Sequence, residues 1–119
     1  MSEYKTVNIK GKEYVTVAER IRFLAEEIKD YSIETEYLYF PDRKMWVVKA
    51  TLSFNDKTYT GLAQEIESTD EKQVNYASAL ENCETSAVGR ACAFAGIGIV
   101  NGIASADEIN KHENRTIRR

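Results

Sequence analysis

The sequence is short of the features that define several protein classes. It has one proline and six glycines, too few for a disordered or low-complexity chain. No apolar run approaches the ~18 residues that a membrane span needs, and the N-terminal stretch lacks the apolar centre of a signal peptide. Its two cysteines, Cys83 and Cys92, lie nine residues apart on opposite faces of one predicted helix, and the single histidine is His112. These absences predict a cytoplasmic protein without a disulfide or a zinc site.

The sequence also lacks a large excess of charge of one sign. The 119 residues include 16 Lys and Arg against 19 Asp and Glu, which gives a net charge of −3. Residues 111–119 (KHENRTIRR) carry four basic side chains and one acidic, so the other 110 residues are more acidic than the total suggests. A dedicated binder of double-stranded DNA is usually strongly basic. Any contact with nucleic acid must therefore use a local patch.

The pattern of apolar residues predicts one α+β domain at residues 16–110, between a lead-in (1–15) and a basic tail (111–119). Thr16 and Glu19 form a capping-box pattern before an amphipathic helix, and a second such box at Ser105 and Glu108 begins a short helix. Three aromatic and β-branched runs joined by tight turns predict an antiparallel β-meander, followed by a long helix. The expected bounds are 17–30 for the first helix, 31–40, 45–54 and 58–67 for the strands, and 75–95 for the long helix. We expect the helices to cover one face of the sheet, and Gly61 to mark a bulge or a close backbone approach.

Residues that could perform catalysis are few. His112 has no obvious nucleophile as a partner, and no phosphate-cradling glycine motif is present. Glu34 and Glu36 alternate on one strand, so they either share a metal in a nuclease site or form a solvated outer face. We expect no enzymatic activity, no cofactor and no metal.

Binding residues are more prominent, in the first two predicted strands and their turn. Tyr39 and Trp46 stand close in sequence to Arg43, Lys44 and Lys49. Exposed aromatic rings beside cations on a sheet are a common platform for single-stranded nucleic acid. The alternative is that the aromatic rings fill the core and that the turn is a solvated hairpin tip.

Arg90 is the most informative single position. It lies in the middle of the long helix between Gly89 and Ala91, in a stretch of small and apolar residues. A cation there needs a partner, which is either a carboxylate such as Glu84 or Glu65, or a phosphate. Both interpretations remain open at this point.

The segment from Ala79 to Ala91, ALENCETSAVGRA, follows the three predicted strands and leads through an apolar stretch to Gly96. In this segment and in its order of elements, the chain resembles the phage single-strand annealing proteins of the Rad-fifty-two-like superfamily, particularly the small Sak-type members. The resemblance covers residues 16–107. The helix segment carries it, and the strands match only in pattern.

The resemblance implies a β-β-β-α core whose protomers assemble side by side into rings or filaments in the cytoplasm of a bacterial host. It implies that single-stranded DNA lies in a groove between the hairpin and the long helix, and that complementary strands anneal without ATP or metal during recombination and repair. Arg90 would contact the DNA backbone from the helix, Arg43 and Lys44 from the hairpin, and Lys49 from the second strand. The basic tail either docks on a neighbour, binds DNA, recruits a host single-strand-binding protein or is a frayed end.

A second function of a different class also fits the sequence. A small phage accessory module could use its sheet edge or its aromatic residues on a protein partner, without touching nucleic acid. The acidic charge balance favours this alternative. The salt dependence of binding distinguishes the two functions, because phosphate contacts weaken steeply as the salt concentration rises and a protein interface need not.

Overall fold

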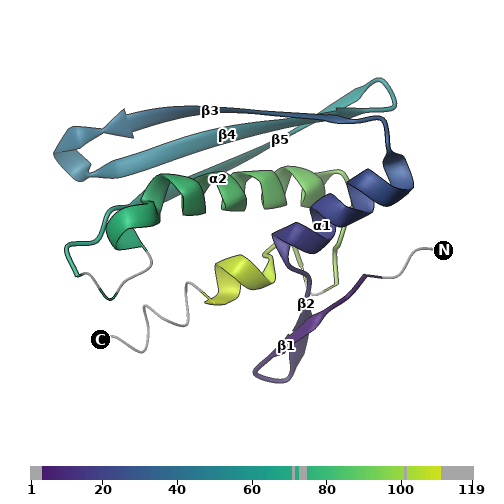
Figure 1. The fold of residues 1–119 in the computed structure, drawn as a ribbon, viewed down its shortest axis with the longest axis horizontal. Helices are drawn as coiled ribbons and strands as arrows, with labels where there is room; N and C mark the ends of the chain where they lie inside the picture. Colours follow the sequence, from purple (N-terminus) through teal and green to yellow (C-terminus); the bar gives the residue numbers. More distant parts are fainter. Residues whose placement is uncertain (1–3, 71, 73–74, 101, 111–119) are drawn as a thin grey trace.

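The computed structural model describes residues 4–70, 72, 75–100 and 102–110. A short hairpin comes first, followed by a helix, a three-stranded sheet and a long helix that lies across one face of that sheet (Figure 1). The last described helical turn covers residues 106–110. The elements are β1 (Val7–Ile9), β2 (Lys12–Tyr14), α1 (Val17–Phe23), β3 (Ser32–Phe40), β4 (Met45–Phe54), β5 (Lys57–Ile66) and α2 (Asn75–Phe94).

The predicted α+β class and the antiparallel pairing of strands are confirmed, but the predicted order of elements is not matched fully. The lead-in contains an additional two-stranded antiparallel sheet, β1–β2, which Figure 1 shows apart from the main sheet. Lys10 and Gly11 connect its strands, and both have positive φ, 51° and 87°. A two-residue turn with two positive φ angles matches the right-handed twist of a hairpin. These residues therefore fold as a hairpin and not as a loose lead-in.

The main sheet has the strand order β3-β4-β5. Asn55 and Asp56 connect β4 to β5 as a two-residue turn with φ of 53° and 61°, and four residues, 41–44, connect β3 to β4. Alternate residues of β4 face α2 and form the centre of the core, where Val48, Ala50 and Leu52 are fully buried. This alternation is the period of two that a half-buried strand requires.

Small residues let α2 lie very close to the sheet. A Cβ atom added at Gly61 on β5 would stand 2.3 Å from the carbonyl oxygen of Ala87 and 2.4 Å from the amide nitrogen of Ala91. The close approach predicted at Gly61 is therefore confirmed. Among the described residues of α2, Cys83, Ala87 and Ala91 belong to the core. Cys83 and Cys92 are both buried thiols.

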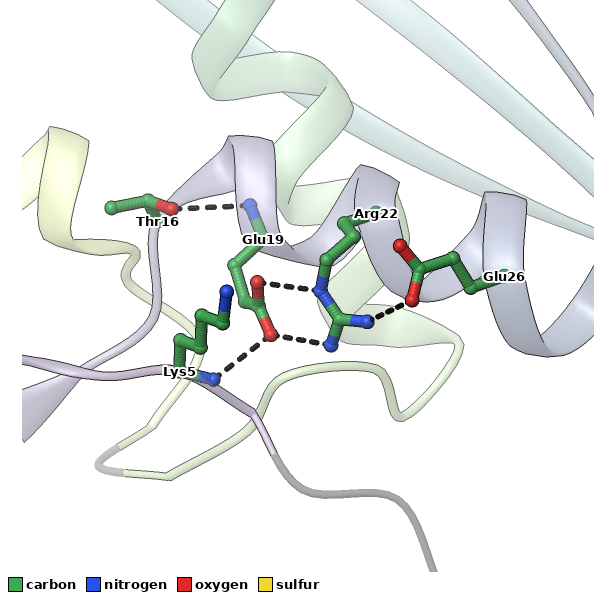
Figure 2. A network of polar contacts seen from close by, with 5 residues as sticks. All are labelled: Lys5, Thr16, Glu19, Arg22 and Glu26. Atoms are coloured by element: carbon green, nitrogen blue, oxygen red, sulfur yellow. Dashed lines mark hydrogen bonds and ion pairs between the residues drawn. The ribbon is translucent and has the colours of Figure 1, made fainter.

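Helix α1 begins at a polar network that Figure 2 shows. The Thr16 hydroxyl accepts a hydrogen bond from the backbone N–H of Glu19 at 3.1 Å, as the capping box predicts. The Glu19 carboxylate accepts from the Arg22 guanidinium (2.6 and 2.8 Å) and from the backbone N–H of Lys5 (2.9 Å). The other side of Arg22 contacts Glu26 at 2.6 Å. Glu19 thus ties the N-terminal segment to α1.

The first helix is shorter than predicted and changes its winding. After Phe23 the chain continues as one π-helical turn, Leu24–Ile28, in which the Lys29 N–H donates to the carbonyl of Leu24 at 2.7 Å. Lys29 then ends the helix with φ of 72°. Helix α2 is also irregular near its start, where Ser78 has φ of −132°.

The last helical turn begins at the second predicted capping box, which is confirmed. Ser105 Oγ accepts from the Glu108 N–H, and Glu108 Oε1 accepts from the Ser105 N–H, both at 3.3 Å. Asp107 Oδ1 also accepts from the Val17 N–H at 2.7 Å, which joins this turn to the start of α1. The predicted basic tail, 111–119, lies outside the described residues.

Candidate nucleic-acid interface

Three aromatic rings gather on the side of the sheet that faces α2, near the β3–β4 turn. Tyr37 and Tyr39 stand opposite Val48 and Trp46 in the register of β3 and β4. The ring centroids of Trp46 and Tyr39 are 4.3 Å apart, and those of Trp46 and Tyr37 are 5.6 Å apart. We call Tyr37, Tyr39 and Trp46 the aromatic cluster.

The aromatic cluster is open to solvent because α2 lies over β4 and β5 and makes few contacts with β3. Tyr37 is 61% exposed and Tyr39 36%, whereas Trp46 is half-buried against the core. Neither predicted alternative therefore holds for the whole set. Trp46 belongs partly to the core, and the two tyrosines present their rings to solvent.

Glu67 holds two of these rings in place. Its carboxylate accepts hydrogen bonds from the Tyr39 hydroxyl at 2.9 Å and from the Trp46 indole N–H at 3.2 Å. The hydrogen bond to the carboxylate, followed by burial, raises the pKa of Tyr39. Sequence reasoning missed Glu67, although its place one residue beyond β5 puts it level with Lys44, whose carbonyl accepts from the Glu67 N–H at 2.8 Å.

Arg43 and Lys44 lie at the end of the sheet beside the aromatic cluster. Residues Pro41–Arg43 form a single 3₁₀ turn, and Lys44 closes it with φ of 49°. Both basic side chains are exposed. The structure thus brings four of the six predicted site residues, Tyr39, Trp46, Arg43 and Lys44, to one end of the hairpin.

Lys49 lies on the other face of the sheet. It is three residues from Trp46 on the same strand, and side chains separated by an odd number of residues point to opposite faces. Its cross-strand neighbours are Glu36 on β3 and Leu62 on β5. This separation could have been predicted from the sequence, because one position is even and the other odd, and such positions of one strand lie on opposite faces of the sheet.

Arg90 is also apart from the aromatic cluster, and it has a carboxylate partner. Its guanidinium lies 3.6 Å from Glu108 Oε2 and 5.8 Å from the centroid of the Phe94 ring. Glu108 belongs to the last helical turn, which Figure 1 shows on the side of α2 away from the sheet. The partner is neither Glu84, which accepts from the Thr35 hydroxyl, nor the buried Glu65.

A buried arginine that sequence reasoning missed lies at the centre of the helical layer. Arg20 is fully buried and donates to the carbonyls of Gly89 at 2.8 Å and Gly98 at 3.1 Å, and burial lowers its pKa. It holds α1 against α2 and the loop after α2. The available signal for this burial was the position of Arg20, three residues after Val17 and four before Leu24, which puts it on the buried face of α1.

The opposite end of the sheet is less suited to phosphate. An open depression of about 430 Å³ there is lined by residues that include Asp30, Asp56 and Lys57. Two carboxylates and one ammonium repel an anion more than they attract it. Within the described residues, no group of three or more His, Cys, Asp or Glu side chains could hold a metal ion. Glu34 and Glu36 are exposed on the outer face of β3.

The chain matches no protein-family model, and neither a curated protein nor a solved structure shows significant similarity to it. The resemblance to phage annealing proteins thus stays a prediction. None of the helices formed by the described residues has the length and apolar character to cross a membrane.

Proposed function

We propose that this protein binds single-stranded DNA and promotes annealing of complementary strands in phage recombination, without ATP, as a homo-oligomer. The observation that carries the proposal is the exposed aromatic cluster beside Arg43 and Lys44 at one end of the hairpin. In this proposal, β3, β4, β5 and α2 are the β-β-β-α annealing core of the Rad-fifty-two-like superfamily.

The aromatic cluster and the basic turn supply two different interactions with a single strand. Tyr37 and Tyr39 are two residues apart on β3, so their Cα atoms stand roughly 7 Å apart and the two side chains offer separate surfaces to the bases. Stacking a base on an aromatic ring contributes about 1–3 kcal/mol and tolerates any sequence. Arg43 and Lys44 then contact the phosphates that flank the stacked bases.

The proposed site is smaller than the resemblance implies. Lys49 lies on the other face, and Arg90 is engaged by Glu108, so neither belongs to the first contact with DNA. Two cations on a chain of net charge −3 give a weak site in one protomer. Assembly compensates, because linked sites on one strand raise the overall affinity by about 10²–10⁴-fold.

The test is a fluorescence anisotropy titration of labelled oligo-dT at low salt. We expect the double variant Arg43→Ala/Lys44→Ala to bind at least about tenfold more weakly, since losing 1.4 kcal/mol of contact energy costs a factor of ten. Lys12→Ala/Lys57→Ala removes the same charge from β2 and from the other end of the sheet, and we expect it to bind like the wild type. Equal losses in both would contradict the site, and no binding by the wild type would contradict the function.

Stacking is tested separately with Tyr37→Ala. Tyr37 is largely exposed, so its removal leaves the fold in place. We expect about tenfold weaker binding to oligo-dT with an unchanged dependence on salt, because no charge is lost. Annealing itself is followed by energy transfer between two labelled complementary strands, in buffer without ATP or divalent metal.

One observation favours the alternative of a protein-interaction module without nucleic-acid activity. The face of the sheet opposite α2 is apolar at one end and uncovered by any described element. If this alternative is right, the protein shows no binding to oligo-dT of the kind that weakens steeply as the salt concentration rises.

A further inference from the structure

The outer face of the main sheet, opposite α2, carries an apolar patch at the end nearest the β3–β4 turn. In an antiparallel sheet with one solvated face, the outward residues are normally polar. Here three successive rows of cross-strand neighbours contain six large apolar side chains, with Gln64, Glu36 and Lys49 between them. The outer patch consists of Leu38, Phe40, Met45, Val47, Leu62 and Ile66.

Four of the six side chains of the outer patch are exposed in the protomer, and Met45 and Val47 are half-buried. Leu38 is 63% exposed, Leu62 60% and Ile66 56%. Figure 1 shows all the described helices on the other side of the sheet, and no described element covers this one. Single exposed apolar residues are ordinary, but a contiguous group of them marks an interaction surface.

The chemistry of this face suits a protein and not a nucleic acid. The three rows that contain the outer patch include one cation, Lys49, whose cross-strand neighbour is Glu36, and Glu34 stands one row further along. Phe40 is the one aromatic ring of the outer patch, and its other five side chains are not aromatic and offer bases no stacking surface. The partner must therefore present apolar surface of its own.

We infer that the outer patch binds a second copy of this chain, so that two sheets pack face to face in a twofold-symmetric dimer. The inference rests on the proposed function, in which the protein acts as a homo-oligomer. Three strands of nine or ten residues, about 4.8 Å apart, present a face of roughly 14 by 34 Å before side chains project from it. Two such faces amount to roughly 950 Å², below the ~1,200–2,000 Å² of a standard stable interface, so the dimer is a weak one, in which the two sheets pack aligned at about 10 Å.

The row of the face nearest the β3–β4 turn is self-complementary. A rotation of 180° about an axis parallel to the strands exchanges β3 with β5 and keeps each row at its own level. Phe40 then meets Ile66 of the second copy, and Val47 on the central strand meets its counterpart. Lys49 on the central strand also meets its counterpart, at the border of the apolar centre. The Glu36 side chains of the two copies flank this pair of like charges and offset part of its repulsion.

This dimer brings together both proposed DNA sites. Because the axis runs parallel to the strands, both β3–β4 turns lie at the same end of the dimer. Each turn carries Arg43 and Lys44, and each aromatic cluster faces away from the interface. One strand of DNA can then contact two basic turns, which compensates for the weak binding expected of a single acidic protomer.

The test is the mass of the full chain in solution without DNA, by sedimentation at high micromolar concentration. We expect twice the 13.5 kDa of one chain for the wild type and a twofold lower mass for Leu38→Lys/Leu62→Lys. Ile99→Lys places the same charge at an exposed apolar position on the loop after α2, and we expect it to stay dimeric. A monomeric wild type, or a Leu38→Lys/Leu62→Lys variant that stays dimeric, would overturn the inference.

A second measurement does not depend on destabilising substitutions. Val47→Cys adds one thiol at the centre of the outer patch, while Cys83 and Cys92 are buried. We expect a short bismaleimide to join two Val47→Cys chains but not two wild-type chains, and no cross-linked product would count against the dimer. Both measurements omit DNA, so failure to dimerise is distinguishable from failure to bind oligo-dT.

Discussion

Gly61 is the residue that sets the distance between the sheet and α2. It lies on β5 opposite the backbone of Ala87 and Ala91, and there is no room for a single added carbon. Its φ is not in the positive range, so glycine is required here for space and not for conformation. The small residues of α2 at this level serve the same close approach.

We therefore expect Gly61→Ala to destabilise the protein by about 3 kcal/mol or more, the upper part of the range for overpacked cores, because the added carbon meets backbone atoms that move only with the whole helix. Urea unfolding measures the change. Gly11→Ala is the control, since its surroundings are open and it suffers only the strain of positive φ, about 1 kcal/mol. Gly61→Ala as stable as the wild type would contradict the close packing.

Gly61 and Arg20 show what a sequence can and cannot predict about single residues. A lone glycine inside a strand pattern indicates a close approach, and Gly61 has that role. Arg20 is fully buried, and the sequence did not indicate this, because arginine is normally exposed. Its burial depends on the carbonyls of Gly89 and Gly98, which come close to it only in the folded chain.

Among the elements, those with a strong local pattern were predictable and those stabilised by distant contacts were not. β4 has the predicted bounds, and the tight turn expected at residues 55–57 is formed by Asn55 and Asp56, with Lys57 already in β5. The β1–β2 hairpin has strands of three residues each, too short for alternation to stand out. The available signal was the pair Lys10–Gly11 between Ile9 and Lys12. The aromatic cluster is open only because α2 lies over β4 and β5, which no local pattern of β3 records.

The start of α1 gives a pH-dependent prediction. The hydrogen bonds from Arg22 hold the pKa of Glu19 at about 2, well below its ordinary value of 4.5, against the opposing effect of burial. A carboxylate with a lowered folded pKa contributes stability that is present above pH 4.5 and is lost as the pH falls toward 2.

We expect Glu19→Gln to be about 1–2 kcal/mol less stable than the wild type at pH 7, a value that allows for the partly exposed Arg22. The difference should shrink as the pH is lowered from 4.5 toward 2. Thermal unfolding between neutral and acid pH measures it. Glu27→Gln, an exposed carboxylate of the same helical segment, should behave like the wild type throughout. A difference that stays constant with pH would exclude an ionic role for Glu19.

At the scale of the whole molecule, the basic groups are divided by the fold. Arg43 and Lys44 lie at one end of the sheet, Lys49 on the outer face, and Arg90 beside Glu108. A sequence count of cations near the hairpin therefore overstates the charge that one strand of DNA can meet in one protomer. Only the contacts of the folded chain show this division.

The division predicts the salt dependence of DNA binding. Each phosphate contact on a single strand contributes about −0.7 to the slope of log affinity against log salt. One protomer with two cations, Arg43 and Lys44, should give a slope of about −1.4, and a dimer that engages one strand with both turns about −2.8. We expect the steeper slope for the wild type with a long oligo-dT. The Leu38→Lys/Leu62→Lys variant should give the shallower slope, although it carries more positive charge, because it presents one turn at a time. Equal slopes for the two proteins would mean that one turn is enough, and a slope near zero for the wild type would favour a protein partner over DNA.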